Sequence, residues 1–579
     1  MQTTHTTQHK NAPQTAGQSK FHPVIQRIFD KREMSPSDIK EFLSWDLKDL
    51  PDLTDMKDMD KASKRIIEAM ANNEKIAIYG DYDVDGTTSC ALLYHFFKML
   101  GTEVGLIQPS RFIEGYGIHP PQIEKGHENG YKIMITVDCG ITNNEAADKA
   151  KELGLDLIIT DHHKDARDEM PDAFAIINPN RRDEPADSPR VSLAGVTVGF
   201  ALAVKIRQDL IDSGREVASI YPLLQFAAIG TICDLAALNP MNLKIVRHGL
   251  KQVPTTKYPG IRAFFTPEER KRGFVPAEKL GFNIGPLINS KGRLDHPEKA
   301  LNLLITDDDQ KAFEFYSHLE ISNKERKFIQ AEVFNSARDQ VLKTMDGSEH
   351  TVTIVYAPEW HEGVIGIVAS KLVDAFKVPA IVFTDSGEKG IIKASARSAG
   401  GLNLFDCLKE NEELFIKFGG HHAAAGLSMV KENLDAFKKN MQATVSSFPA
   451  IQRTVQSYYD LEITPEEVNP RLLKELELLE PYGMGNQKPI FKMKGFRLDS
   501  YDLLKDIHVR WNFSSIKDPS VRLKGISFNY IGKWGIVHPE ELFNSQSIRG
   551  EELTAYFTLA VNHFNGNQYI QLMIERMEV

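Results

Sequence analysis

The feature that most constrains the fold is an apolar run followed by a helical stretch, repeated three times from Glu74 onward. The three runs are KIAIYG (75–80), KIMITV (132–137) and LDLIIT (155–160). Short apolar runs that alternate with helical segments are typical of a parallel sheet with helical crossovers. We therefore predict an α/β domain with a parallel sheet in this part of the chain.

Acidic or histidine residues follow each of these runs directly. They are Asp81, Asp83 and Asp85 after the first run, Asp138 after the second, and Asp161, His162 and His163 after the third. In open parallel sheets, ligands bind beyond the carboxyl ends of the strands. We therefore expect the three strands to deliver these side chains to one crevice.

Taken alone, each motif has a simpler explanation. Asp81–Gly86 begins like a calcium-binding EF-hand loop, but the twelfth position, which requires a bidentate glutamate, is Leu92. An acidic turn is the plainer alternative for this motif, as a solvated turn is for the histidine pair. The combination favours a metal site, because so many carboxylates in one place would be costly without a cation.

The combined set can hold two divalent ions that share a bridging carboxylate. Aspartate and histidine ligands without cysteine suit Mn²⁺ or Mg²⁺, and the imidazoles favour Mn²⁺. Two such ions convert a bridging water to hydroxide and neutralise the attacked phosphate. The sequence has neither a GxSxG elbow nor a GxxxxGK[ST] loop, which disfavours an esterase or an ATP-driven motor. A metal-dependent phosphoester hydrolase is the predicted class.

Composition limits the remaining classes. The chain has 579 residues, 42% of them hydrophobic and 26% charged, as expected for a globular protein of three or four domains. The net charge of −10 is unusual for a protein that binds a polyanion, but bound cations reverse the local sign. The four cysteines form no CxxC pair, and no apolar run is long enough to span a membrane. We expect a cytoplasmic protein without membrane attachment.

Changes of pattern along the chain suggest six segments. The long stretch 298–345 is rich in helix formers, a second β/α pattern begins at 351, and alternating apolar and polar residues dominate after about 457. The predicted segments are a disordered tail (1–20), a helical N-terminal segment (21–70), a catalytic domain (71–295), connecting helices (296–345), a second α/β domain (346–450) and an all-β domain (451–579).

The strand-end motifs GDYDVDGTTS, ITVDCGI and ITDHH together resemble the DHH phosphoesterase superfamily. The rest of the chain is similar to its bacterial nuclease branch, the RecJ family. Further matching motifs, in the order of the family, are PSRFIEGYG, INPN, LAGV, GTICD, EWHEGVIGIVASKL, GGHHAAAG and EPYGMGN. The resemblance implies a DHH domain, a DHH-associated substrate-binding domain over 346–450, and an OB-fold over 451–579.

The resemblance further implies a 5′ to 3′ exonuclease specific for single-stranded DNA, with two Mn²⁺ or Mg²⁺ ions per active site and a role in recombination and repair. Single-strand-binding protein and a RecQ-type helicase are the implied partners. The implied metal ligands are Asp81, Asp83, Asp85, Asp138, His162 and Asp234, with Asp138 bridging the two ions. Asp161 and His163 are assigned to orienting and transition-state roles, so that the implied catalytic residues are Asp161, His162, His163 and Asp138.

The implied substrate contacts lie in other motifs. They are Arg111, Arg293, Arg397, Gly419, Gly420 and His421. Two motifs depart from the family pattern: NAAGR reads Asn289-Ser290-Lys291-Gly292-Arg293, and GRS reads Ala396-Arg397-Ser398. Both keep the arginine. In the C-terminal domain, Trp511, Phe513, Phe528 and Tyr530 are available to stack on bases, but aromatic residues at strand spacing are more often part of a core.

Two alternatives remain open. A DHH phosphodiesterase of small substrates, such as oligonucleotides or cyclic dinucleotides, would not need the connecting helices and the extra β domain. A non-catalytic DNA-binding scaffold would not need the complete ligand set.

Overall fold

The structure, a computed structural model, describes residues 20–110, 114–165, 169–292, 298–345, 349–533, 535–564 and 567–579. The chain forms two compact units. The larger comprises Glu41–Ser457 and Glu480–Lys488, and the smaller comprises the described residues up to Lys40, Tyr458–Leu479 and Pro489–Val579. None of the helices in the described ranges combines the length and apolar character needed to cross a bilayer.

The first part of the larger unit is built on a five-stranded parallel sheet with the order β2-β1-β3-β4-β5. Its strands are β1 (Lys75–Gly80), β2 (Val104–Ile107), β3 (Tyr131–Val137), β4 (Asp156–Thr160) and β5 (Ala175–Ile177). The central strands are buried along most of their length, as both faces are covered by helices.

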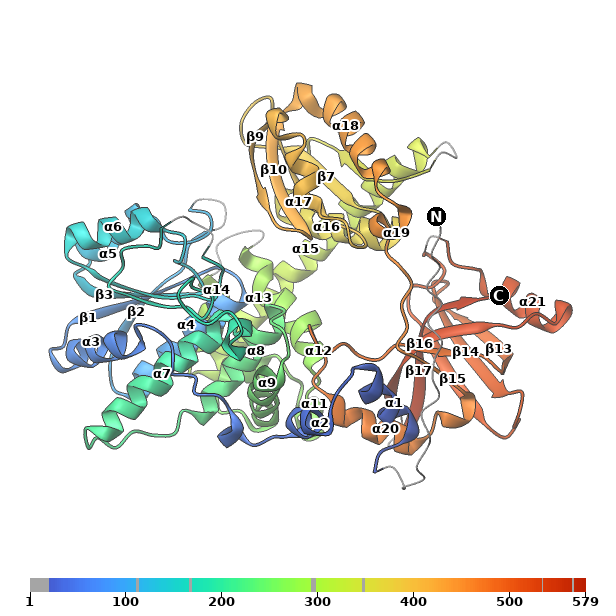
Figure 1. Ribbon diagram of the computed structural model, residues 1–579, viewed down its shortest axis with the longest axis horizontal. Helices are drawn as coiled ribbons and strands as arrows, with labels where there is room; N and C mark the ends of the chain where they lie inside the picture. Colours follow the sequence, from blue (N-terminus) through green and yellow to red (C-terminus); the bar gives the residue numbers. More distant parts are fainter. Residues whose placement is uncertain are drawn as a thin grey trace, which may run out of the picture. The chain divides into compact units, whose positions relative to one another are not determined.

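Helices α5 (Pro120–Glu128) and α6 (Asn144–Leu153) cover one face of this sheet, as Figure 1 shows. The other face carries α3 (Met59–Ala71), α4 (Val84–Met99) and α7 (Gly195–Asp212). Helices α8 (Leu224–Cys233) and α9 (Pro240–Gln252) form a further layer, in which α8 packs on α4 and α7. The chain continues through α10 (Pro259–Ala263), α11 (Pro267–Lys271), α12 (Ala277–Lys279) and α13 (Gly285–Gly292).

Two helices, α14 (Glu298–Ile305) and the 36-residue α15 (Asp309–Thr344), lead to a second sheet. Its strands are β6 (Thr353–Tyr356), β7 (Ala380–Asp385), β8 (Ile391–Arg397), β9 (Phe415–Gly420) and β10 (Ala424–Val430), in the order β6-β7-β8-β10-β9. The end of α15 and α16 (Glu362–Phe376) pack on one face of this sheet. Helices α17 (Leu404–Lys409) and α18 (Leu434–Ser447) pack on the other.

The smaller unit contains a seven-stranded sheet with the order β11-β12-β16-β17-β15-β14-β13. Its strands are β11 (Leu461–Ile463), β12 (Phe491–Met493), β13 (Phe496–Leu504), β14 (His508–Ser515), β15 (Arg522–Ser527), β16 (Thr554–Phe564) and β17 (Asn567–Glu578). Helices α20 (Pro470–Leu476) and α21 (Pro539–Arg549) belong to the same unit.

Three of the four aromatic residues considered for base stacking lie in the core of this unit. Trp511, Phe513 and Tyr530 are at most 1% exposed, and the indole of Trp511 donates a hydrogen bond to Ser527 Oγ at 2.9 Å. Phe528 is 53% exposed. Of the four, only Phe528 presents a surface on which a base can stack.

The predicted fold class is confirmed. The three apolar runs are β1, β3 and β4, and the all-β character of the C-terminal part is the seven-stranded sheet. The short edge strands β2 and β5 were not predicted. Helix α1 (Pro23–Lys31) packs on α20 and β11 of the smaller unit, where Arg27 pairs with Glu467 at 2.6 Å. This pairing of the beginning and end of the chain is invisible to local sequence patterns.

Candidate active site

The structure brings the predicted ligands together at the carboxyl end of the first sheet. Their side chains form three groups in which the possible ligand atoms lie within 4.8 Å of one another. The groups are Asp81 with Asp83 and Asp138, Asp138 with His162 and His163, and Asp85 with His162 and Asp234. Asp138 and His162 each belong to two groups, so the three groups form one continuous cluster.

Asp138 and His162 stand at the centre of this cluster. Oδ1 of Asp138 and Nε2 of His162 are 3.2 Å apart and buried, and neither makes a hydrogen bond within the described part of the chain. Nε2 of His162 also lies 3.7 Å from Oδ2 of Asp234 and 3.8 Å from Oδ2 of Asp85. Buried polar atoms normally have partners, so these two atoms fit a bound cation that both can ligate.

The electrostatics of the cluster support the same conclusion. Burial and the neighbouring carboxylates raise the pKa of Asp85 to about 7, and burial and Asp83 raise the pKa of Asp234 to about 7. Burial, followed by the charges of the surrounding aspartates, raises the pKa of Asp138 well above its ordinary value. The protein thus places several carboxylates where their charges repel one another, and divalent cations would relieve that repulsion.

The first motif supplies three of the aspartates because a strand passes directly into a helix. Asp81 follows β1, and Asp83 caps α4 by accepting a hydrogen bond from the Gly86 amide at 3.1 Å. Asp85 lies in the first turn of α4 and is fully buried. Its two oxygens accept hydrogen bonds from the amides of Gly195, at 2.6 Å, and Val196, at 2.8 Å.

Two glycines allow other helices to approach the cluster closely. A Cβ atom on Gly195, at the start of α7, would lie 2.8 Å from Cβ of Asp138. A Cβ atom on Gly230, in α8, would lie 2.8 Å from Oδ1 of Asp85. These contacts give a physical reason for the glycine of LAGV and the glycine of GTICD, two residues to which the sequence assigned no role.

Asp161 has a different environment from the other aspartates. Its Oδ1 accepts the amides of His162 and His163 at 2.7 and 3.1 Å, and lies 2.8 Å from Nδ1 of His163. Its Oδ2 accepts the Ile141 amide at 2.9 Å. Burial raises the pKa of Asp161, but the hydrogen bond to the His163 side chain, the charge of His163 and the hydrogen bond from the Ile141 amide outweigh burial and lower it below its ordinary value. Conversely, burial lowers the pKa of His163, but the hydrogen bond to Asp161 raises it to about 9.

The substrate-binding residues predicted for the second sheet also lie together. Arg397 ends β8 and is the Cα partner of Ala424 in β10, whose carbonyl accepts the amide of His421 at 2.9 Å. Gly419 and Gly420 end β9, and Gly420 is the partner of Ala425. Within the described residues, the guanidinium of Arg397 bonds to Ser395 Oγ and the Ala396 carbonyl but to no carboxylate. Arg111 and Arg293 lie outside the described residues.

Comparison with known proteins decides the family. The models of three families match: the DHH family N-terminal domain over residues 75–231, the DHHA1 domain over 349–447 and the RecJ OB domain over 459–576. The single-stranded-DNA-specific exonuclease RecJ of Escherichia coli (strain K12) is 30% identical over 573 residues, which cover 96% of each chain. The chain belongs to the RecJ family.

Further members of the family show a comparable similarity. The protein of the same name from Bacillus subtilis (strain 168) is 33% identical over 560 residues, which cover 95% of this chain and 67% of that one. The crystal structure of RecJ from Thermus thermophilus in complex with Mn²⁺ matches 97% of this chain and 76% of that one, with a TM-score of 0.77 and 25% identity. A structure of exonuclease RecJ bound to manganese matches with a TM-score of 0.57 and 30% identity, over 69% of this chain and 96% of that one.

Three residues that organise this site were not selected from the sequence. The side-chain amides of Asn178 and Asn180 donate to the carbonyls of His163, at 2.9 Å, and His162, at 2.6 Å. The hydroxyl of Tyr116 lies 3.0 Å from Nδ1 of His163 and donates to the Asp138 carbonyl at 3.3 Å. The motifs INPN and GYG contain these residues, but no chemical type in either motif singles out a role.

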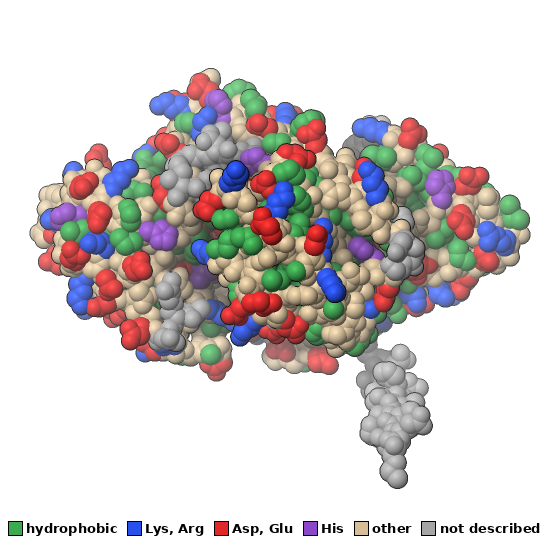
Figure 2. Space-filling model, turned by 90° about the horizontal axis from the view of Figure 1, so that it is seen from above, with side chains coloured by type: hydrophobic (Ala, Val, Ile, Leu, Met, Phe, Trp, Pro, Cys, Tyr) green, Lys and Arg blue, Asp and Glu red, His purple; other side chains and the backbone are tan. Residues whose placement is uncertain are grey.

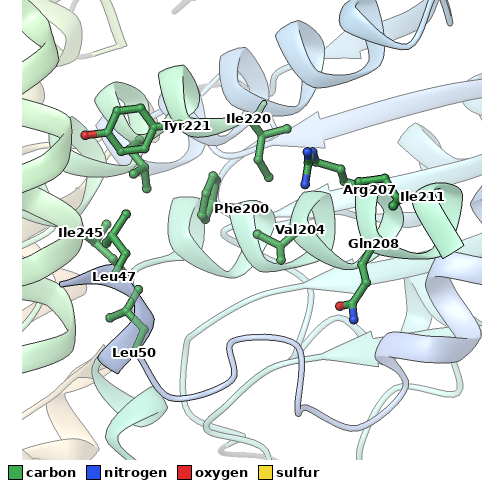
Figure 3. A pocket seen from close by; sticks show the side chains of 11 residues that line it. Leu47, Leu50, Phe200, Val204, Arg207, Gln208, Ile211, Ile220, Tyr221 and Ile245 are labelled. Atoms are coloured by element: carbon green, nitrogen blue, oxygen red, sulfur yellow. The ribbon is translucent and has the colours of Figure 1, made fainter. Parts of the chain in front are cut away.

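One apolar cavity lies away from the aspartates. A cavity of about 390 Å³ is lined by Phe200, Val204 and Ile211 of α7, together with side chains of other helices (Figure 3). Its lining contains neither a carboxylate nor a histidine. On the face shown in Figure 2, Lys and Arg of the described residues are interspersed with Asp and Glu rather than gathered in a broad basic patch. Neither feature offers another catalytic centre.

Proposed function

We propose that this RecJ-family chain degrades single-stranded DNA from the 5′ end by hydrolysing phosphodiester bonds with two Mn²⁺ or Mg²⁺ ions. The observation that carries the proposal is the pair of ligand groups, Asp81/Asp83/Asp138 and Asp85/His162/Asp234, joined through Asp138 and His162. When bound, two divalent ions supply a hydroxide nucleophile at neutral pH and neutralise the attacked phosphate. The family makes the chain a metal-dependent phosphodiester hydrolase.

In this proposal, each residue near the cluster has a defined task. Asp138 and His162 hold the centre, because their facing atoms make no hydrogen bond within the described residues. Asp161 orients the two histidines, because its oxygens are occupied by their amides, by His163 Nδ1 and by the Ile141 amide. His163, whose side chain is 45% exposed, can reach the phosphate and stabilise charge that develops in the transition state.

In this proposal, residues at the end of the second sheet bind the DNA strand. The Arg397 guanidinium can bind phosphate oxygens in bidentate fashion, because no described carboxylate competes for it. The exposed turn at Gly419, Gly420 and His421 lets a strand approach the main chain. We propose that Arg111 and Arg293 also contact phosphate. We further propose that residues 71–295, 346–450 and 451–579 act as three functional domains.

The biological setting follows from the same proposal. We propose that the protein acts in the cytoplasm in DNA recombination and repair, with single-strand-binding protein and a RecQ-type helicase as partners. These partners would supply the single strand on which the nuclease acts. A pull-down with each partner would test this part separately from the chemistry.

The test uses single strands labelled at either the 5′ or the 3′ end, incubated with Mn²⁺, Mg²⁺ or a chelator. We expect the metal ions to support loss of the 5′ end, the chelator to stop it, and blunt duplex to resist. Preference for a dinucleotide over a long strand would instead indicate a phosphodiesterase of small substrates. Binding of single strands without nucleotide release, unchanged by chelator, would indicate a scaffold.

A further inference from the structure

The segment Glu480–Lys488, EPYGMGNQK, belongs to the larger unit although the chain on both sides of it belongs to the smaller one. It leaves the smaller unit after Leu479 and returns to it at Pro489. The proposed chemistry gives this segment no task. Its contacts within the larger unit therefore need a separate explanation.

The segment is a preformed turn. Gly483 and Asn486 exchange two main-chain hydrogen bonds of 3.1 Å, and the side-chain amide of Asn486 donates to the Pro481 carbonyl at 2.8 Å. Asn486 is 1% exposed. Gly485 has a φ of +76°, which L side chains adopt only with strain. Hydrogen bonds within the turn thus help to fix its conformation.

This turn contacts the chain on both sides of Asp234. The Met484 carbonyl accepts the Leu238 amide at 2.7 Å. A Cβ atom on Gly483 would lie 2.8 Å from Cδ1 of Leu238 and 3.7 Å from Cδ1 of Ile232. A Cβ atom on Gly485 would lie 3.6 Å from Cβ of Ala237. Residues two positions before and three to four positions after Asp234 therefore pack on the turn.

Helix α9 holds both partners of this contact. Nε of the buried Arg247 donates to the Glu480 carbonyl at 2.9 Å. Asn242, earlier in the same helix, donates to the Ala237 carbonyl at 2.8 Å. The connection between Asp234 and α9 is thereby held by two hydrogen bonds, one from Asn242 of the helix and one to the Met484 carbonyl of the turn.

Asp234 needs such support more than the other predicted ligands do. Asp138 follows a central strand and its amide donates to the Thr160 carbonyl at 3.0 Å, whereas Asp234 ends α8. The next residue, Leu235, has a φ of +59° and is 69% exposed. Asp234 therefore lies in a turn after a helix and lacks the strand hydrogen bonding that holds Asp138.

We propose that Glu480–Lys488 is a positioning element that holds Asp234 beside His162 and Asp85, so that the ion at this group depends on a segment supplied by the C-terminal part of the chain. The inference rests on the proposed function, because it takes Asp234 as a metal ligand. Partners that orient ligands typically change metal affinity by about 10- to 100-fold when they are altered.

The test is a calorimetric titration of the full, metal-stripped chain with Mn²⁺. Gly485→Val forces a β-branched residue into left-handed backbone within the turn. Gly495→Val imposes the same strain at a φ of +70°, with no atom near its Cβ, and is the matched control. Asn486→Ala loosens the turn without adding bulk.

We expect two ions in the parent and the control, with one of them bound about tenfold or more weakly in both turn variants. With saturating single-stranded DNA, kcat should fall in these variants while KM stays within twofold of the parent. Parent-like binding of both ions by both turn variants would overturn the inference alone, as would equal weakening of the two ions. Absence of Mn²⁺ binding by the parent would overturn the proposed function and the inference with it.

Discussion

The two sheets of the larger unit present their predicted functional residues in opposite ways. At the end of the first sheet, buried aspartates are fixed by main-chain amides, and their charges repel one another. At the end of the second sheet, an arginine without a described carboxylate partner lies beside an exposed turn of glycine and histidine. In the proposed function, the first arrangement would hold cations, whereas the second would bind the anionic phosphates of the substrate.

The difference predicts that substitutions of the proposed metal ligands at the first sheet lower kcat and metal binding, whereas substitutions of the proposed phosphate contacts at the second sheet raise KM. A substitution of a first-sheet ligand that raises only KM, or of a second-sheet contact that lowers only kcat, would contradict this division of tasks.

The largest expected effect is that of Asp138→Ala, which removes the residue shared by two ligand groups. We expect nuclease activity to fall by about 10³-fold or more with little change in the circular dichroism spectrum. Because Asp138 has a φ of +60°, Asp138→Asn is a second variant, since asparagine tolerates this backbone. Asp172→Ala, at a 65% exposed side chain, is the control and should be neutral. Activity within tenfold of the parent in both Asp138 variants would refute the central role of this residue.

Arg397→Ala should have the next largest effect, and on a different parameter. Loss of hydrogen bonds to a charged phosphate should raise KM for single-stranded DNA by about 10- to 100-fold while kcat changes little. Arg397→Lys should recover only part of the loss, because an ammonium group cannot bind two phosphate oxygens in a planar fork. Arg338→Ala, an exposed arginine of α15 that pairs with Asp339, is the control. An unchanged KM with a reduced kcat would place Arg397 in the catalytic group instead.

Much of the first sheet could be predicted because its evidence is local. An apolar run followed by acidic residues places those residues at a strand end, and β1, β3 and β4 are where the runs predicted them. Asp234 follows a helix, so spacing alone could not place it near His162, and only the family resemblance identified it. The tasks of Asn178 and Tyr116 were unpredictable, because each depends on a hydrogen bond to a main-chain atom or side chain brought close by folding.

The C-terminal part shows the corresponding limit for aromatic residues. Trp511 and Phe513 alternate along β14 with polar neighbours, a pattern common to core strands and to stacking surfaces. A core role and a stacking role differ in whether this face of β14 is buried or exposed. That depends on how β14 pairs with β13 and β15 on either side. Likewise, the attachment of Glu480–Lys488 to the larger unit depends on contacts with α8 and α9, which local sequence patterns do not predict.

Tyr116→Phe should give a smaller effect confined to the first sheet. Removal of one hydroxyl leaves the ring in place but takes away the contacts to His163 and the Asp138 carbonyl. We expect kcat to fall by about fivefold, with KM and Mn²⁺ affinity unchanged, since one hydrogen bond typically contributes about 1 kcal/mol. Tyr131→Phe, at the first residue of β3, is the control. Parent-like kcat would show that the hydroxyl does not orient His163.

The smallest effect is a pH-dependent change in Tm on addition of Mn²⁺. Variants of the first sheet should lose this change, whereas variants of the second sheet should keep it. Burial and carboxylate neighbours raise the pKa of Asp85 and Asp234 to about 7, above the value of about 3.9 in an unfolded chain. Their favourable contribution to folding is therefore complete below about pH 4 and is lost as the pH rises through about 7. The metal-free protein should lose stability over this range.

Saturating Mn²⁺ should oppose this loss, because the ion binds the ionised carboxylates of the folded state. We expect Mn²⁺ to raise Tm by several degrees at pH 8 and by clearly less at pH 5.5, as measured by differential scanning fluorimetry. Arg397→Ala should keep this response, whereas Asp138→Asn should lose most of it. A Tm increase independent of pH, or equal in the two variants, would mean that the carboxylates of the first sheet do not set the response to metal.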